Sequence, residues 1–228
     1  MMFRLTFPLT LVAALFTSPA QAVWFNSLIY DIPSDKTFIS RPIVNDTDRT
    51  NLYTLSAYKI DKPGKGGERR IDGGAQEILW SPLKFTIAPD GSEYFKLYYR
   101  GPQDDQERYY RVVFKEAPVR LFPLAETRRN LNIIPVTAMS TILIVRPRQS
   151  RFAWHVDEKT GVIENTGNTY FRVIIHNGCN GDDESSTQFY MLPGDKYQDS
   201  NVSAGNRKFI VAMERYHPLG SGCFSPQP

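Results

Sequence analysis

The sequence contains few of the residues that metal binding and nucleophilic catalysis require. Among 228 residues there are only two cysteines and three histidines. The histidines, His155, His176 and His217, show no E-x-x-H or H-x-x-x-H spacing, so each is expected to be a strand-surface or turn residue. There is also no G-x-S-x-G motif of a serine hydrolase. The sequence therefore predicts no metal site, no cofactor and no enzymatic activity.

Basic residues are only in slight excess, and no phosphate-binding motif accompanies them. The formal net charge is +3, and the Lys and Arg residues do not gather into an aromatic-interleaved patch of the kind that binds nucleic acid. The Gly-rich stretch Lys62–Arg70 lacks the G-K-[ST] ending of a nucleotide-binding loop and is expected to be a polar surface loop. We therefore expect neither nucleic acid nor nucleotide as a partner.

Long apolar runs are absent except near the N-terminus. There, Arg4 precedes an apolar run of about twelve residues, Leu5–Phe16, whereas roughly twenty are needed to span a bilayer. Ala20 and Ala22 then form an A-x-A cleavage site. This pattern predicts a secretory signal peptide over residues 1–22 that is cleaved after Ala22, and it disfavours the alternative of a membrane anchor.

An exported chain with two cysteines is expected to join them in one disulfide. Cys179 and Cys223 would close a loop of about 45 residues, and we expect them to pair with each other rather than to bind a metal. The acidic clusters Asp104–Asp105 and Asp182–Glu184 lack the spacing of a calcium loop. We expect both clusters to be solvated loops.

Aromatic residues are abundant, with 12 Tyr and 14 Phe, and Pro and Gly are spread along the chain, which is typical of an all-β protein. Alternating apolar and polar residues predict strands over residues 25–30, 37–44, 52–60, 78–82, 83–87, 93–100, 108–115 and 131–148. After a linker at 147–150, a smaller set is predicted over residues 152–156, 161–165, 170–177, 188–192 and 207–214. We expect two β-sandwich domains, residues 23–147 and 148–228, the first of them immunoglobulin-like.

The longest predicted strand, residues 131–148, has no glycine and no acidic residue and is rich in β-branched side chains. Both its even and its odd positions are largely apolar, so both of its faces need cover. Pro135 cannot donate to a β-ladder, which places this part of the strand at a sheet edge or a bulge. A long apolar edge is an aggregation hazard, so either this chain or a partner must cover it.

Several sequence motifs, in this order, resemble those of periplasmic pilus (fimbrial) chaperones, and are similar to the alternate, class 5 type that includes the common-pilus chaperones. They are L-I-Y-D-I-P-S-D, V-N-D-T-D, W-S-P-L-K-F-T-I-A-P-D-G, E-R-Y-Y-R-V-V-F-K, I-L-I-V-R-P and G-V-I-E-N-T-G-N. The resemblance spans residues 23 to 215. It implies two immunoglobulin-like domains in a boomerang arrangement. It also implies a periplasmic protein that lends an edge strand to incomplete pilin subunits and delivers them to an outer-membrane usher.

The resemblance assigns the long strand as the lent, or donor, strand. Its even face is the expected donor face, while its odd face would pack on the protein's own core. The donor residues are then Ile134, Val136 and Ala138, extended by Ile142 and Ile144. A shift of register by one residue stays open, because Ile133 is also apolar and Pro135 can mark a bulge.

The chain departs from the family where many members hold the subunit's terminal carboxylate with an Arg and a Lys. Alignment on the motifs places Ile29 and Ile142 at those two positions. A buried carboxylate still needs a cation or several donors, and Arg111 is our candidate, with an ordinary surface arginine as the alternative.

Arg146 matches a family arginine that forms an interdomain salt bridge. Glu107 is its expected partner, and Asp199 lies near the region from which a third, acidic member would come.

Two other functions compete with that of a chaperone. One is a secreted β-sandwich binding module or adhesin whose long strand pairs internally, and the other is an exported hydrolase that uses Asp104 and Asp105. Self-association of the free protein to hide its edge strand is also left open.

Overall fold

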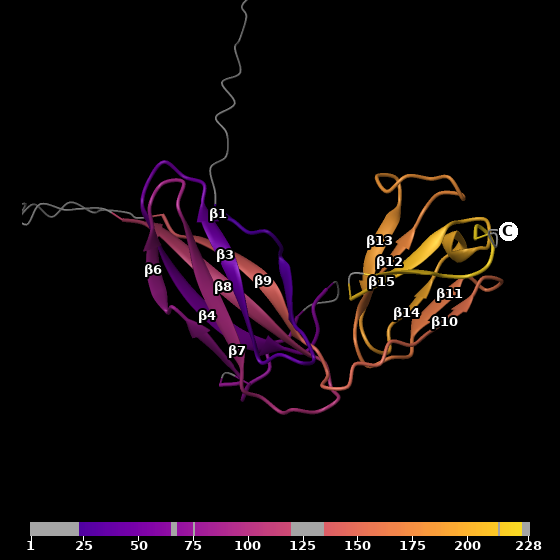
Figure 1. The fold of residues 1–228 in the computed structure, drawn as a ribbon, viewed down its shortest axis with the longest axis horizontal. Coiled ribbons are helices and arrows are strands. Elements are labelled where there is room, and N and C mark those ends of the chain that lie inside the picture. The colour runs from indigo at the N-terminus through magenta and orange to yellow at the C-terminus, as the bar shows by residue number, and fades with distance from the viewer. Residues whose placement is uncertain (1–22, 65–67, 75, 120–134, 214, 225–228) are drawn as a thin grey trace, which may run out of the picture.

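The computed structural model describes residues 23–64, 68–74, 76–119, 135–213 and 215–224. Strands form two lobes that are joined at one end and diverge at the other, which is the expected boomerang (Figure 1). In the described part of the chain the single helix is the three-residue 3-10 turn η1, Ser200–Val202. No helix among these residues has the length and apolar character needed to cross a bilayer. The all-β fold of two immunoglobulin-like domains is therefore confirmed.

The N-terminal lobe packs two sheets face to face. One sheet has the strand order β1-β3-β7-β5 and the other β2-β9-β8-β4-β6. The strands of the first sheet are β1 Val23–Trp24, β3 Phe38–Asn45, β7 Ser92–Tyr99 and β5 Ile78–Ser81. Those of the second are β2 Ile29–Ile32, β9 Thr137–Val145, β8 Arg108–Pro118, β4 Asn51–Ile60 and β6 Lys84–Ile87.

Side-chain alternation explains why these segments form a sandwich. In β7, Phe95, Leu97 and Tyr99 are buried, while the residues between them are exposed. The ring of Phe114 on β8 lies 4.9 Å from that of Phe95 and 4.7 Å from that of Phe25, so aromatic side chains of both sheets meet in one core.

The structure corrects the expected strand at residues 25–30: residues 25–28 are not in a strand, and they connect β1, Val23–Trp24, to β2, Ile29–Ile32, in the other sheet. β1 pairs with β3, whereas β2 pairs in parallel with β9, with Ile29 opposite Ile142. Ser27 turns the chain between them: its hydroxyl donates to the Ile29 carbonyl at 2.7 Å and accepts from the Ile29 amide at 3.1 Å. The N-terminal segment, residues 23–32, therefore adds one short strand to each of the two sheets.

The C-terminal lobe is a smaller sandwich of sheets β10-β11-β14 and β13-β12-β15-β16. All five predicted strands are present with shifted ends, and two further short strands, β14 and β16, were not predicted. The strands are β10 Trp154–Asp157, β11 Val162–Asn165, β12 Phe171–Ile175, β13 Thr187–Met191, β14 Lys196–Gln198, β15 Lys208–Ala212 and β16 Arg215–Pro218. The predicted disulfide is confirmed, because Cys179 and Cys223 are bonded with their Cα atoms 5.2 Å apart.

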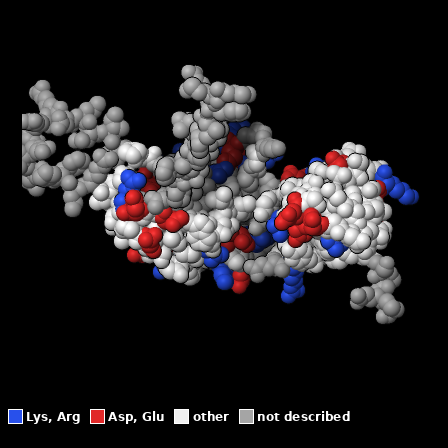
Figure 2. Space-filling view, turned by 90° about the horizontal axis from the view of Figure 1, so that it is seen from above, with Lys and Arg blue, Asp and Glu red and all other residues white. Residues whose placement is uncertain are grey.

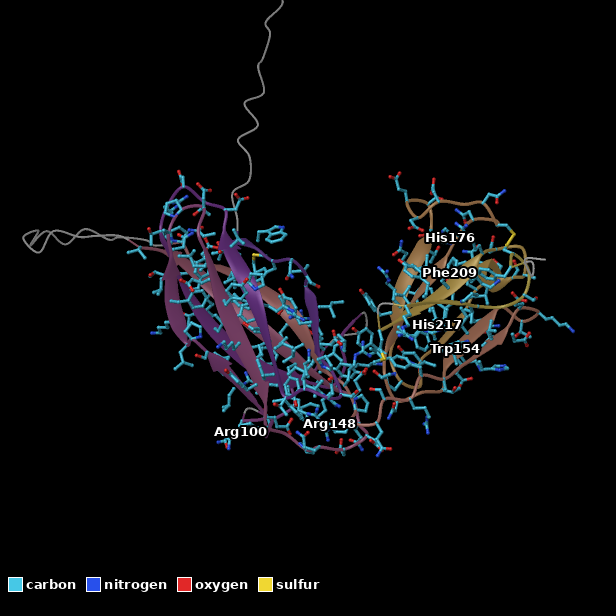
Figure 3. All side chains as sticks on the ribbon, viewed as in Figure 1. Arg100, Arg148, Trp154, His176, Phe209 and His217 are labelled. Atoms are coloured by element: carbon cyan, nitrogen blue, oxygen red, sulfur yellow. A yellow bond between two sulfur atoms is a disulfide. The ribbon has the colours of Figure 1, made fainter. Side chains whose placement is uncertain are left out.

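The linker between the lobes is held by the N-terminal lobe. Arg148, which lies where the two lobes meet (Figure 3), donates through Nη1 to the carbonyls of Ser34 at 2.8 Å and Lys36 at 2.7 Å. Its amide donates to the carbonyl of Asp104 at 2.9 Å, and the Gln149 amide donates to Asp105 Oδ1 at 3.1 Å. The junction is thus a hydrogen-bonded structure rather than a free tether.

Candidate functional site

One edge of β9 is only partly covered. On one side, β8 pairs with the whole strand, from Thr137 opposite Glu116 to Val145 opposite Arg108. On the other side, β2 pairs only with residues 142–145. Among the described residues, the edge of residues 137–141 therefore has no strand partner, although alternate backbone amides and carbonyls point out of such an edge.

The two faces of β9 differ as the alternation predicts. On the odd face, Leu143 and Val145 belong to the core of the N-terminal lobe and Met139 packs against it. On the even face, Ala138 is exposed, and Val136, just before the strand, is 59% exposed. The face that is free to contact another molecule is therefore the even one. Ile134, the first predicted donor residue, lies outside the described residues.

The structure corrects the extension of this donor face to Ile142 and Ile144. Both lie on the even face, but they are only 8% and 3% exposed. They form a small apolar cluster with Tyr109 of β8 and with Leu192 of the C-terminal lobe. Because the C-terminal lobe covers them, the open part of the face ends before residue 142.

Arg111 lies in line with the end of the open edge. It is opposite Ile142 in the β8–β9 ladder, and Ile142 is opposite Ile29 in the β9–β2 ladder, so the three side chains form one row across the sheet. They line a cleft of about 470 Å³ between the lobes, together with Lys62 and Leu192. This row contains both positions at which the family resemblance expects a cation. The sequence alone could not show that Arg111 shares their row.

The guanidinium of Arg111 is already paired. Its Nε donates to the two carboxylate oxygens of Glu68 at 3.0 and 3.1 Å, its Nη2 also contacts that carboxylate, and its Nη1 donates to Ser140 Oγ at 3.3 Å. Both side chains of the ion pair are 21% exposed. The sequence reasoning did not single out Glu68, because it treated residues 62–70 only as a surface loop.

The predicted salt bridge between Arg146 and Glu107 takes a different form. Arg146 is buried, and its Nε donates to Asp31 Oδ2 at 2.7 Å, while its Nη1 donates to the hydroxyl of Thr169 at 2.9 Å. That hydroxyl in turn donates to Glu107 Oε2 at 2.5 Å. Among the described residues, Glu107 therefore reaches Arg146 only through Thr169 of the C-terminal lobe.

Glu107 also binds the backbone of the C-terminal lobe, since the amide of Tyr170 donates to its Oε2 at 3.0 Å. The guanidinium of Arg146 lies 4.5 Å from the Tyr170 ring centroid. Asp199 is not part of this network: it caps η1 by accepting from the Asn201 amide at 2.8 Å. The acidic partner that the sequence reasoning missed is Asp31, which β2 brings beside the end of β9.

The pH dependence of stability provides a test of this junction. Burial raises the pKa of Glu107, although hydrogen bonds from Thr169, Tyr109 and Tyr170 and the charge of Arg146 act in the opposite direction. The contribution of Glu107 to stability is then fully present below its unfolded pKa and is lost as pH rises through the raised folded pKa. We expect Glu107→Gln to flatten the decline of unfolding free energy with rising pH, as measured by urea denaturation at several pH values. Glu164→Gln on β11 is the control, and parallel curves for Glu107→Gln and the wild type would contradict the assignment.

The two aspartates of the hydrolase alternative have structural partners. Arg108 donates to both carboxylate oxygens of Asp104 at 2.6 Å, and this hydrogen bonding lowers the pKa of Asp104 to about 2. An acid with such a pKa is ionised at neutral pH and cannot act as a proton donor. Asp105 accepts from the amide of Gln149 in the linker, so both carboxylates take part in hydrogen bonds that hold local structure. On the face shown in Figure 2, acidic and basic side chains are interspersed.

Comparison with known proteins identifies relatives of this chain. No family model matches it. A protein described as probable fimbrial chaperone EcpE, from Escherichia coli O127:H6 (strain E2348/69 / EPEC), is 35% identical over 223 residues, covering 96% of this chain and 93% of that protein. A protein described as probable fimbrial chaperone EcpB, from Escherichia coli O157:H7 (strain EC4115 / EHEC), is 28% identical over 200 residues, covering 86% of this chain and 89% of the relative.

Solved structures of fimbrial chaperones share the fold. The class 5 fimbriae chaperone CfaA has a TM-score of 0.50 at 15% identity, over 90% of this chain and 96% of CfaA. A chain from the Salmonella enterica SafA pilin in complex with the SafB chaperone has a TM-score of 0.52 at 14% identity, over 89% of this chain and 95% of the other. The fold agrees with the relationship that the sequence identity establishes. This chain therefore belongs to the family of fimbrial chaperones.

Proposed function

We propose that this protein binds pilin subunits in the periplasm by lending them the open edge of β9, and then delivers them to an outer-membrane usher. The observation that carries the proposal is the edge of residues 137–141, which has no strand partner among the described residues: its even side chains, Ala138 and Ser140, are exposed, while Met139 on the odd face packs against the core. The SafA pilin in complex with the SafB chaperone shows that a protein of this fold occurs bound to a pilin.

Strand addition at this edge would use two kinds of interaction. Main-chain hydrogen bonds to the unpaired backbone groups of β9 would hold the subunit, and alternate side chains would fill its groove. The exposed residues Val136 and Ala138 would be the donor residues, and Ile134 would continue the same face. Because the odd face is anchored in the chaperone's own core, the donor strand is held extended before a subunit arrives, which reduces the entropic cost of binding.

The position where β2 begins defines where a subunit strand must stop. The Ile142 amide donates to the carbonyl of Leu28 at 2.8 Å, so from this residue on the edge of β9 is occupied. A subunit strand that follows the open edge therefore ends beside Ile29 and Ile142, in the row that contains Arg111. We propose that Arg111 binds the terminal carboxylate there, because a guanidinium offers two parallel donors to a carboxylate.

The remaining assignments follow from the same proposal. Residues 1–22 would be a signal peptide that directs the protein to the periplasm. Arg146, Asp31, Thr169 and Glu107 would hold the two lobes at the angle that forms the cleft. No nucleotide or catalytic step is required, because exchange of an imperfect donor strand for a better-fitting one can drive assembly.

Co-expression with a pilin that lacks its final strand tests this function. We expect a stable one-to-one complex on purification, whereas the pilin alone should aggregate or be degraded, because its groove exposes apolar surface. Recovery of equal amounts of soluble pilin without the chaperone would contradict the proposal.

Arg111→Met tests the anchor within that complex. We expect its affinity for the pilin to fall about tenfold to a hundredfold, corresponding to the ~1.5–3 kcal/mol of hydrogen bonds to a charged group. In a pilin extended by two C-terminal glycines, the terminal carboxylate lies beyond Arg111. This pilin should bind the wild type weakly, and its affinity should not change when Arg111 is replaced by Met. Arg100→Met, which removes an exposed arginine elsewhere on the N-terminal lobe, is the matched control. An unchanged affinity of Arg111→Met for the unextended pilin would exclude Arg111 as the anchor.

A further inference from the structure

The proposed anchor is occupied by a carboxylate of the protein itself. Glu68 engages the Nε and Nη2 side of Arg111, which is one of the two sides that a guanidinium offers for bidentate binding of a carboxylate. Among the described residues, Arg111 is the only hydrogen-bond partner of the Glu68 side chain. Arg111 lines the cleft and lies in the same row as Ile142, where the open edge of β9 ends.

The position of Glu68 is set by the stem that follows it. The amide of Asp61 donates to the Arg69 carbonyl at 3.0 Å, and the amide of Arg69 donates back to Asp61 Oδ1 at 2.9 Å. Arg70 forms a β-bridge with Ile60, and its guanidinium lies 5.0 Å from the Tyr58 ring centroid. Glu68 is therefore held beside β4, the strand that pairs with β8 and Arg111.

Two carboxylates cannot share one guanidinium without cost. A second anion at Arg111 would lie within a few ångströms of Glu68 in a partly buried cleft, where like charges repel strongly. A subunit carboxylate must therefore either displace Glu68 or bind more weakly. In the free protein the same glutamate neutralises a guanidinium that is only 21% exposed, which avoids an unpaired charge in the cleft.

We propose that Glu68 is an internal competitor for the anchor: it occupies Arg111 in the free chaperone and is displaced by the terminal carboxylate of a pilin subunit. This inference rests on the proposed function. It makes Glu68 a specificity-determining residue, because only a carboxylate that arrives with strand pairing along β9 has enough additional binding energy to displace it. Isolated acidic peptides are excluded from the cleft by the same contact.

Competition for a limiting amount of a strand-deleted pilin tests the inference. Wild-type protein and Glu68→Gln carry different affinity tags and are mixed in equal amounts, and the pilin captured by each is measured. We expect Glu68→Gln to capture about fivefold more pilin, since its uncharged amide cannot hold Arg111 against a carboxylate; fivefold corresponds to ~1 kcal/mol. The advantage should disappear with the pilin extended by two C-terminal glycines.

Matched variants make the result decisive. Glu93→Gln removes an exposed glutamate from β7 on the other sheet and should capture the same amount as the wild type. Glu68→Asp keeps the negative charge on a shorter side chain, so the amount of pilin that it captures should lie between the amounts captured by the wild type and by Glu68→Gln. This second variant keeps the test valid if one of the two has a folding defect. Equal capture by Glu68→Gln and the wild type, combined with a loss in Arg111→Met, would overturn the competitor role and leave the anchor intact. Equal capture by the wild type, Glu68→Gln and Arg111→Met would also overturn the anchor role of Arg111.

Discussion

Val136→Asp is expected to abolish recovery of the complex between this protein and a strand-deleted pilin. Val136 is 59% exposed, so an aspartate at this position costs the free chaperone little. In the complex the same side chain would enter the apolar groove of the subunit, where an unpaired carboxylate costs several kcal/mol. We expect the affinity to fall roughly a hundredfold or more, measured by co-purification and by titration of the purified proteins.

The neighbouring residue makes this experiment a test of register. Thr137 is also exposed but points to the opposite face of the strand, so Thr137→Asp should leave most of the complex intact. Leu79→Asp, at an exposed apolar position on β5, controls for a general loss of surface apolarity. If Thr137→Asp abolished the complex and Val136→Asp did not, the donor register would be shifted by one residue. If neither variant changed recovery, donor-strand binding through this segment would be wrong.

Removal of the disulfide is expected to have the largest effect on folding stability. The bond joins residues 44 positions apart and closes the C-terminal sheet onto the end of the chain. In the chain-entropy model, a disulfide that closes a loop of this length stabilises the folded state by about 4 kcal/mol. We expect the double variant Cys179→Ser, Cys223→Ser to lose about this much unfolding free energy, a large fraction of the ~5–15 kcal/mol that is typical of a domain.

The N-terminal lobe provides the control for this measurement. It contains no cysteine, so its urea transition should be unchanged while that of the C-terminal lobe moves to lower urea. The native tail retains a second attachment, because the Ser221 hydroxyl donates to Glu158 Oε2 at 2.8 Å. The variant should therefore keep its fold in the absence of denaturant, as judged by circular dichroism. If the urea transition of the C-terminal lobe were the same in the variant and the wild type, the disulfide would not stabilise the lobe by restricting its unfolded chain.

Local pattern was sufficient for much of the fold. The alternation in β9 placed Met139, Leu143 and Val145 on the face that packs on the core, because residues two apart on a strand share a face wherever the strand lies. The same periodicity and the turn residues placed most of the longer strands, whereas the short strands β1, β14 and β16 were missed. The disulfide followed from a count of two cysteines in a chain that is expected to be exported.

Long-range pairing explains the errors. The partner of Arg146 is Asp31 rather than Glu107, because β2 runs parallel to β9 and brings a residue 115 positions away in the sequence beside it. Ile142 and Ile144 looked like donor residues by alternation, but Leu192 of the other lobe covers them. Nothing in the local sequence pattern indicates that Lys208 in β15 is buried. It is nevertheless fully buried, and its ammonium lies 2.7 Å from the Glu158 carboxylate.

The sequence by itself determined that this protein is an all-β chain with one long strand whose two faces are both apolar. Only the tertiary structure decided where that strand is open. β2 and the C-terminal lobe cover its second half, and in the described part of the chain no strand pairs with the outer edge of residues 137–141. The structure also decided that Arg111, across β9 on β8, lies in line with the end of this edge and is paired with Glu68. Periodicity is a property of neighbouring residues, whereas an edge, a cleft and an ion pair depend on segments that meet only after the chain has folded.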